Sequence, residues 1–239
     1  MYSFDSRVRY SEVNCNCTME LNTLIDYFQD CSSFQSEDLG VGIEYYKNQG
    51  FAWLLTSWQI IVNRFPTFGE EITTSTWPYA FDRVYGYRNY MMKAKNGDVL
   101  AIANSQWIYV DIQKSHPIKL TDDITNIYKT EPKYDGMEYS TRRLKLPENY
   151  TEHESFSVLM HHLDSNKHVN NGQYIKMAQR YLPDYFKIWQ MRAEYKQQAL
   201  LSDIIIPQVS IKDHICTIAL VNIDKKPYCI IEFMSKADK

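Results

Sequence analysis

The chain has 239 residues, of which 44% are hydrophobic and 23% are charged, proportions typical of a globular protein rather than a disordered one. Its formal net charge of −3 argues against broad binding to nucleic acid, which needs a basic face. The longest apolar-rich run, residues 51–62, is shorter than the roughly 20 residues of a membrane span, so we expect no stable insertion into a membrane.

The cysteines and the first residues bear on cellular location. The five cysteines include no Cys-x-x-Cys pair, which favours reduced thiols over disulfides or a cysteine zinc site. Residues 1–10 carry Asp5, Arg7 and Arg9 without an apolar stretch, unlike a secretory signal. The sequence therefore predicts a cytoplasmic protein.

The first half of the chain predicts a strand and then a long helix. Residues 4–10 alternate as a strand would, and a short second helix is expected over residues 44–48. The long helix runs toward Gln35, before the stop signals Gly40 and Gly42. Its apolar stripe at helical spacing consists of Leu21, Leu24, Ile25 and Phe28.

A meander of strands should follow this helix. Asn96-Gly97 indicates a type I′ hairpin turn between the last two strands. Stretches rich in aromatic and β-branched residues predict strands over residues 57–64, 71–79, 83–95 and 99–112.

The second half begins after a polar connection, residues 113–152, that contains three prolines and Asp135-Gly136. We then expect a strand over residues 155–162 and a helix that begins near Asn170 or Asn171 and ends before Pro183. Further strands are expected over residues 188–198, 204–210, 214–222 and 228–235.

The two halves look like a degenerate internal repeat. Adding 150 to the numbers of the first helical stripe gives Asn171, Tyr174, Ile175 and Ala178 in the second helix. The same shift sets Asn14 on Asp164, Asn16 on Asn166 and Thr18 on His168 without a gap. The acid and the imidazole therefore stand in the second copy only, which predicts one active site per chain, in the C-terminal half.

The stretch from Asp164 to Asn171 combines a carboxylate, carboxamides and an imidazole directly before a helix. In an extended segment, Asp164, Asn166 and His168 point to the same side. Free N–H groups at the start of a helix can stabilise developing negative charge on a carbonyl oxygen. A structural core needs no such set of polar side chains, so the pattern indicates a site that can polarise a carbonyl oxygen.

The motif Asp164-x-Asn166-x-His168-Val169-Asn170-Asn171-x-x-Tyr174 resembles the active-site segment of the acyl-acyl-carrier-protein thioesterases of bacterial type. Other landmarks of that family appear in the same order and span most of the chain. They are Glu37-Asp38-Leu39-Gly40, Gly50-Phe51-Ala52-Trp53-Leu54-Leu55, Thr76-Trp77-Pro78, Tyr87-Arg88-Asn89-Tyr90 and Ala193-Glu194-Tyr195-Lys196.

The resemblance implies an α+β chain of two tandem hotdog domains, each a long helix wrapped by an antiparallel sheet. The N-terminal domain would cover residues 1–128 and hold the acyl chain, and the C-terminal domain would cover residues 150–239 and carry the catalytic motif. Residues 129–149 would connect them. The implied activity is hydrolysis of fatty acyl-acyl-carrier protein by activated water, without a cofactor or a metal.

Within this resemblance, Asp164 or His168 is the general base, and Asn166 holds the water or the carbonyl. N–H groups near Asn170 and Asn171 would stabilise the oxyanion. The family's second active-site segment carries an acid and a cysteine, where this chain has Gln198 and Ala199. Gln198 can orient water but cannot take a proton, and a cysteine nucleophile is excluded at that place.

Two alternatives remain open, and two others are disfavoured. Acyl-coenzyme A could be the substrate, and the replacement of the acid by Gln198 fits a non-catalytic acyl-carrier or lipid-binding protein. A metal site at His161, His162, Asp164 and His168 is disfavoured, because adjacent histidines on a strand point to opposite faces. A hotdog dehydratase is disfavoured because its His-Phe-Pro-Gly-His type of segment is absent.

The expected partner is acyl carrier protein, which is acidic and should bind a local basic surface. A homodimer stays open. Trp53 and Trp77, with Leu24 and Phe28, are candidates for the acyl-chain wall. The candidate carrier-binding residues are Arg142, Arg143, Lys145, Arg192 and Lys196.

Overall fold

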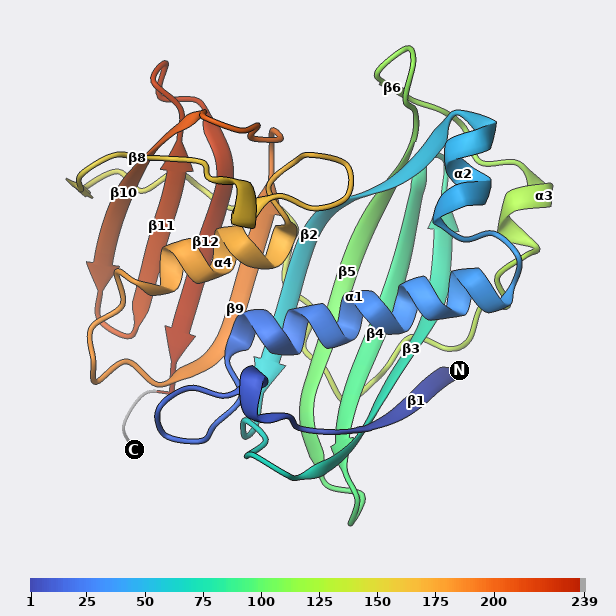
Figure 1. The fold of residues 1–239 in the computed structure, drawn as a ribbon, viewed down its shortest axis with the longest axis horizontal. Helices are drawn as coiled ribbons and strands as arrows, with labels where there is room; N and C mark the ends of the chain where they lie inside the picture. Colours follow the sequence, from blue (N-terminus) through green and yellow to red (C-terminus); the bar gives the residue numbers. More distant parts are fainter. Residues whose placement is uncertain (237–239) are drawn as a thin grey trace. The chain divides into compact units, whose positions relative to one another are not determined.

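The computed structural model describes residues 1–236, and the chain separates into two compact units (Figure 1). Unit 1 consists of Met1–Thr56 and Val62–Tyr139, and unit 2 of Ser57–Ile61 and the chain from Ser140 onward. The expected connection over residues 129–149 is thus divided between the units at Tyr139.

Unit 1 is an antiparallel sheet with a long helix across one face, α1, as Figure 1 shows. The strands follow one another in the order β1, β3, β4, β5, β2. Their bounds are Tyr2–Arg7 for β1, Phe51–Val62 for β2, Glu71–Asp82 for β3, Tyr85–Ala94 for β4 and Val99–Asp111 for β5. The other elements are a 3-10 helix Tyr10–Glu12 (η1), α1 Leu21–Asp38, α2 Ile43–Gln49, β6 His116–Pro117 and α3 Asp122–Thr125.

The core of unit 1 confirms the helical stripe expected from the sequence. Leu24, Ile25 and Phe28 of α1 are fully buried and face the sheet, where α1 contacts β3. Burial of each such side chain contributes about 1.5–3 kcal/mol, so this face rather than helix propensity holds α1 in place.

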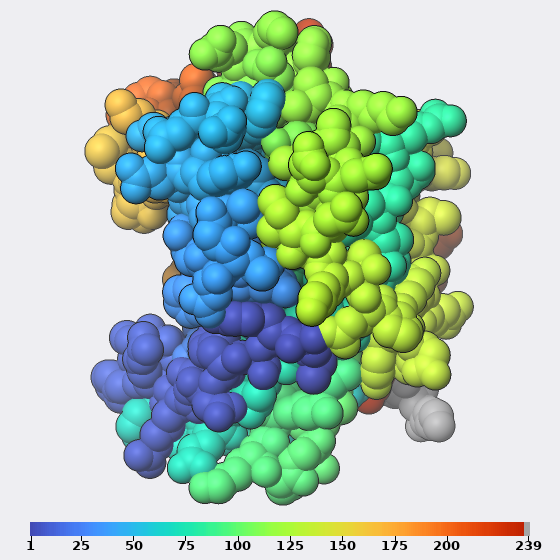
Figure 2. All heavy atoms as spheres, turned by 90° about the vertical axis from the view of Figure 1, so that its right-hand side faces the viewer, coloured from blue at the N-terminus to red at the C-terminus, as the bar shows by residue number. Residues whose placement is uncertain are grey.

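A second, aromatic cluster forms beyond the end of α1. Val41, Tyr46, Tyr109 and Tyr128 are its buried members, and partly buried residues of the segment after β5 pack against them. In the space-filling view, this yellow-green segment covers the face of unit 1 beside α2 (Figure 2). The first part of the polar connection is therefore ordered on unit 1.

Unit 2 repeats this plan with a shorter helix, α4, against its sheet. Residues Ser57–Ile61 of β2 pair with β9, and the order continues through β12, β11 and β10 to β7, with β8 also on β10. The bounds are Thr151–Glu152 for β7, Phe156–Ser157 for β8, Met160–His162 for a 3-10 helix (η2), Asn171–Gln179 for α4, Ile188–Tyr195 for β9, Ile204–Lys212 for β10, Ile215–Val221 for β11 and Pro227–Ser235 for β12.

The hairpin at Asn96-Gly97 is present, but its predicted turn type is wrong. Gly97 N donates to Ala94 O and Ala94 N to Asp98 O, both over 2.9 Å. A type I′ turn needs positive φ at both central residues, whereas here only Gly97 has one, at 91°. The hairpin instead closes with a left-handed glycine in the bulge position.

The predicted strand over residues 155–162 is also wrong beyond Ser157. His161 and His162 lie in η2, and their ring centroids are 4.2 Å apart. The Nδ1 atom of His162 accepts a hydrogen bond of 3.0 Å from the N–H of Leu159, and this local bond outweighs the alternating pattern. The argument that adjacent histidines face opposite ways therefore does not apply.

Tyr10 also differs from its predicted structure, because it belongs to η1 rather than to the first strand.

No helix in residues 1–236 is both long enough and apolar enough to cross a membrane.

Candidate active site

The loop that carries the motif is a compact turn within unit 2. Asp164 N donates to His168 O over 2.8 Å, and Lys167 N donates to Asp164 O over 3.0 Å. Leu163 and Val169 close the base of the loop as an isolated β-bridge, and Lys167 takes a left-handed conformation with φ 64°. We call residues 164–168 the motif loop.

The carboxylate of Asp164 holds this loop together. Its Oδ1 atom accepts the N–H groups of Asn166 at 2.8 Å and of His168 at 3.3 Å. This is the local side-chain to backbone bonding that Asp and Asn favour in turns. Asp164 and His168 are half-buried, and Asn166 is exposed. The three predicted polar residues are therefore brought into one short loop.

The corresponding residues of unit 1 form the same loop. Asn14 Oδ1 accepts the N–H groups of Asn16 at 2.9 Å and of Thr18 at 3.2 Å, and Cys17 has φ 57°. Val13 and Met19 form the matching β-bridge. An amide thus folds the first loop as a carboxylate folds the second. The imidazole of His168, where unit 1 has Thr18, is the clearest chemical difference.

The start of α4 offers fewer free N–H groups than expected. Asn170 is the N-cap, with Oδ1 accepting from Gly172 N over 2.7 Å. Its own N–H donates to His162 O over 2.9 Å. The N–H groups of Asn170 and Gly172 are therefore already bonded, so an oxyanion role for the N–H of Asn170 does not fit this geometry. Asn171 is the first residue of α4, and its carbonyl accepts the hydroxyl of Tyr195 over 3.1 Å.

The second predicted segment lies against the motif loop. Val169 N donates to Ala199 O over 3.0 Å. Val169 directly follows His168 in the chain, and Ala199 directly follows Gln198. Ala199 is fully buried, and its N–H donates to Tyr174 Oη over 2.8 Å. Gln198 itself is exposed. Backbone bonding thus joins the segment of Gln198 to the segment of His168.

Glu194 is a buried charge to which the sequence pattern assigned no role. The residue is 3% exposed, and its Oε1 forms an ion pair of 2.7 Å with Lys196 Nζ. Its Oε2 accepts the N–H of Leu144 over 2.9 Å. The only signal in the sequence is that Glu194 stands in the segment Ala193-Glu194-Tyr195-Lys196 of the resembled family. That pattern does not tell a buried acid from an exposed one.

The five candidate carrier-binding cations differ in their surroundings. Arg192 forms an ion pair of 2.8 Å with Glu232 and donates to Thr141 O over 2.6 Å. Lys196 is paired with Glu194, as described above. Arg143 and Lys145 are exposed, and Arg142 is half-buried. Two of the candidates are thus engaged with carboxylates inside unit 2.

The candidate acyl-wall residues are part of the packing of unit 1. Trp53 Nε1 donates to Tyr46 Oη over 3.2 Å, and Trp77 Nε1 donates to Pro132 O over 3.0 Å. Trp77 is 6% exposed, and the ring of Trp53 lies 4.9 Å from that of Tyr109 between centroids. Both indole N–H groups are therefore satisfied by unit 1 itself.

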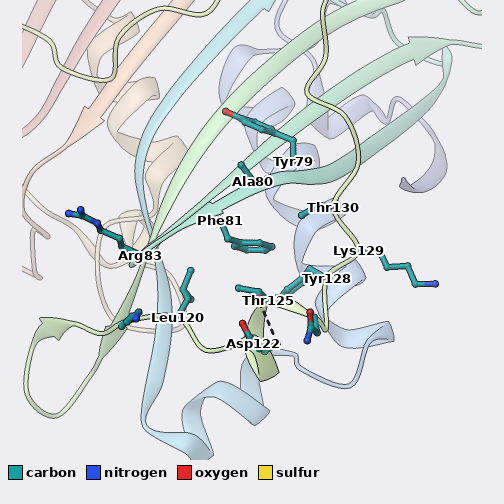
Figure 3. A pocket seen from close by; sticks show the side chains of 12 residues that line it. Tyr79, Ala80, Phe81, Arg83, Leu120, Asp122, Thr125, Tyr128, Lys129 and Thr130 are labelled. Carbon is teal, nitrogen blue, oxygen red and sulfur yellow. Dashed lines mark hydrogen bonds between the residues drawn. The ribbon is translucent and has the colours of Figure 1, made fainter.

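A cavity of about 710 Å³ opens on unit 1, at a place that the sequence did not indicate. In Figure 3, Phe81, Leu120 and Tyr128 converge on it, while Arg83 and Lys129 extend to either side. None of the predicted site residues lines this cavity. Its lining consists of Tyr79, Ala80, Phe81, Arg83, Lys119, Leu120, Asp122, Thr125, Asn126, Tyr128, Lys129 and Thr130.

A metal site at the histidines of η2 finds no support in the described residues. No group of three or more His, Cys, Asp or Glu side chains in residues 1–236 is arranged to hold a metal ion. Burial, then the neighbouring His161 and Arg180, lowers the pKa of His162. A lowered pKa agrees with an Nδ1 atom that accepts a hydrogen bond.

Comparison with known proteins identifies the family of this chain. A family profile described as the acyl-ACP thioesterase N-terminal domain matches residues 1–128. The chain belongs to the acyl-ACP thioesterase family. A palmitoyl-acyl carrier protein thioesterase from Gossypium hirsutum is 25% identical over 190 residues, covering 73% of this chain and 45% of that protein. An oleoyl-acyl carrier protein thioesterase from Arabidopsis thaliana is 22% identical, covering 83% of this chain and 60% of its own.

The chain thus spans about half the length of these curated relatives. Two solved structures resemble nearly all of it. An acyl-ACP thioesterase from Bacteroides thetaiotaomicron has a TM-score of 0.89 at 18% identity, covering 98% of this chain and 97% of its own. A 12:0-ACP thioesterase from Umbellularia californica has a TM-score of 0.84 at 15% identity, covering 99% and 97%. They show a shared hotdog-type fold, with extensive antiparallel sheet and few helices.

Proposed function

We propose that this member of the family hydrolyses fatty acyl-acyl-carrier protein to free fatty acid and carrier protein. The observation that carries the proposal is His168, which stands on the motif loop of unit 2 where the same loop in unit 1 has Thr18. The family match and the hotdog-type fold support it.

His168 is the general base in this proposal. An imidazole can accept and release a proton close to neutral pH, so it can take one from water. The water oxygen forms a bond to the thioester carbon, the carbon–sulfur bond breaks, and the proton held by His168 passes to the departing thiolate. No metal or cofactor takes part.

The remaining polar residues hold the reactants. Asp164 positions the loop through Oδ1, which bonds two backbone N–H groups, and its second oxygen remains to hold the water. Asn166 and Gln198 are exposed amides that can bind the water or the carbonyl oxygen. Asn171, the first residue of α4, is the candidate for the oxyanion.

The two units take different tasks in this proposal. Both are hotdog domains in tandem; unit 1 receives the acyl chain, with Trp53 and Trp77 near its wall, and unit 2 carries the chemistry. The protein acts in the cytoplasm as a monomer or a homodimer. The exposed Arg143 and Lys145, with Arg142, attract the acidic carrier; Arg192 and Lys196, being paired internally, contribute less.

A carrier comparison tests this function. Purified protein is incubated with acyl-carrier-protein thioesters of graded chain length, and thiol release is followed. The same acyl chains on coenzyme A form the second arm, which distinguishes an acyl-carrier-protein hydrolase from an acyl-coenzyme A hydrolase. Release from the carrier-protein series that disappears in His168→Thr supports the proposal, and no release from any carrier contradicts it.

A second candidate is a non-catalytic acyl-carrier or lipid-binding protein. The observation in its favour is the neutral, exposed Gln198, followed by a buried alanine. This candidate predicts binding of acyl-acyl-carrier protein without turnover, and appearance of hydrolysis in Gln198→Glu. A wild-type rate typical of enzymes, about 1–1000 per second, dismisses it.

A further inference from the structure

Two tyrosine hydroxyl groups tie the segment of Gln198 to helix α4. Tyr174, on α4, accepts the N–H of Ala199 over 2.8 Å. Tyr195, at the end of β9, donates to the carbonyl of Asn171 over 3.1 Å. In both bonds the segment of Gln198 supplies the donor and α4 the acceptor, so together they restrain both ends of residues 195–199.

The corresponding pieces of unit 1 lack both bonds. Subtracting 150 from Tyr174 gives Leu24 on α1. Pro66 corresponds to Ala199, because its carbonyl accepts Met19 N over 2.9 Å as that of Ala199 accepts Val169 N over 3.0 Å. Leu24 has no hydroxyl, and Pro66 has no N–H. Unit 1 therefore lacks both the hydroxyl that corresponds to that of Tyr174 and the N–H that corresponds to that of Ala199.

The donor of the second bond, from Tyr195 to Asn171, is also missing from unit 1. Val62 stands four residues before Pro66, as Tyr195 stands four residues before Ala199. Valine cannot donate to the helix. Meanwhile the rest of the corner is retained: Val8 N donates to Glu70 O and Val158 N to Asp203 O, each over 2.9 Å. The fold of the corner therefore does not require the tyrosine bonds, since unit 1 builds it without them.

Burial makes the Tyr174 bond specific. Tyr174 is 2% exposed and Ala199 is 0% exposed, so water cannot replace either partner in the folded protein. Burial also raises the pKa of Tyr174, which keeps the hydroxyl neutral. Replacing Tyr174 by phenylalanine would leave the N–H of Ala199 buried without an acceptor and would loosen the segment.

We propose that Tyr174 is a positioning residue, whose hydroxyl holds the N–H of Ala199 and thereby fixes Gln198 beside the motif loop. This inference rests on the proposed function and adds a residue that acts through Gln198. Tyr195 supports the same segment from its other end.

Kinetics of Tyr174→Phe test the proposal. We expect kcat to fall between about 10-fold and 100-fold with KM within about 2-fold, because misplacement of a catalytic group by about 1 Å has effects of this size. Ala199→Pro removes the same N–H from the other side and imitates Pro66, so it should give a similar loss. The matched control is Tyr27→Phe in α1, which removes a buried hydroxyl that donates to Glu12 Oε2 over 2.9 Å; its kcat should stay at the wild-type value.

A double variant separates positioning from general stability. If Tyr174 acts through Gln198, Tyr174→Phe should cause no further loss in the Gln198→Ala background. Equal losses in both backgrounds, or a wild-type kcat in Tyr174→Phe, would overturn the proposal.

Hydrogen exchange provides a readout that does not depend on activity. Amide exchange of residues 198–200 should become at least about 10-fold faster in Tyr174→Phe, while that of the control Tyr27→Phe stays unchanged. Faster exchange in a protein without turnover would retain the restraint and refute the proposed function. Unchanged exchange would refute the restraint itself.

Discussion

Residues 14–18 of unit 1 and residues 164–168 of unit 2 form one loop twice, with the same backbone bonds and different side chains. Each loop needs an oxygen at its first residue that accepts two N–H groups, and a left-handed backbone at its fourth. Asparagine meets the first need as well as aspartate. The comparison teaches that the acid is compatible with a purely structural role, whereas the imidazole has no such explanation.

The helices that follow the two loops differ in another way. Helix α1 spans 18 residues and α4 spans 9. Each turn of a helix can bury further apolar side chains, so α1 gives unit 1 the longer apolar face. The shorter α4 instead accepts two hydrogen bonds from the segment of Gln198, at the hydroxyl of Tyr174 and at the carbonyl of Asn171. One unit is built for apolar packing and the other for polar contacts.

The largest expected effect comes from giving unit 2 the residue of unit 1. His168→Thr should lower kcat by at least about 100-fold, the lower range for general acid–base catalysis. Thr18 already occupies the equivalent backbone, so thermal unfolding should change little. Thr18→His is the control and should add no activity. A His168→Thr rate within about 3-fold of wild type would remove His168 from the mechanism.

Asp164→Asn separates the charge of the carboxylate from its loop bonds. The amide oxygen can accept the same two N–H groups, as Asn14 does, so stability should be kept and kcat should fall about 10-fold for loss of the charge. Asp164→Ala should also destabilise the loop by about 1 kcal/mol. Urea unfolding with steady-state kinetics measures both. Equal stability of the asparagine and alanine variants would contradict the structural role.

Asn170→Ala should cost about 1 kcal/mol of unfolding free energy, because it removes the N-cap bond to Gly172. The matched change in unit 1 is Glu20→Ala, at an N-cap whose side chain makes no capping bond. Its cost should be less than half as large in the same urea titration. Similar losses at both positions would show that capping is not what Asn170 contributes.

The smallest effect concerns pH. Because the pKa of His162 is lowered in the folded protein, the unfolded chain binds the proton more readily. This contribution to stability is complete above the ordinary histidine pKa of about 6.5 and is lost as the pH falls below that value. His162→Gln should therefore flatten the decline of unfolding free energy between about pH 6.5 and 5. An unchanged slope would assign that decline to other groups.

The sequence was sufficient for the elements with strong periodicity. The stripe at Leu24, Ile25 and Phe28 predicted α1, and the shift of 150 predicted the second copy of the loop. The correspondence of Pro66 with Ala199 lies outside that shift, because α1 and α2 lengthen the chain between loop and strand in unit 1. Hydrogen bonds in the folded corner reveal it.

Side-chain to backbone bonds account for most of the remaining differences. The bond of Leu159 N to His162 turns a predicted strand into a 3-10 helix, and Asn170 consumes an N–H group expected to be free. Residue patterns record polarity and spacing, so they cannot tell which polar atom a loop will use for its own closure. Burial of Glu194 is hidden for the same reason.

The cysteines allow the two loops to be distinguished by thiol labelling. Cys31, Cys216 and Cys229 are buried, and burial raises the pKa of Cys31 to about 12 and that of Cys216 to about 11. Thiolates react with maleimides and thiols hardly do, so these three should resist labelling. Cys15 and Cys17 are exposed on the loop of unit 1. In a Cys15→Ser protein, a fluorophore on Cys17 would therefore label the loop of unit 1 and leave residues 164–168, which contain no cysteine, unlabelled.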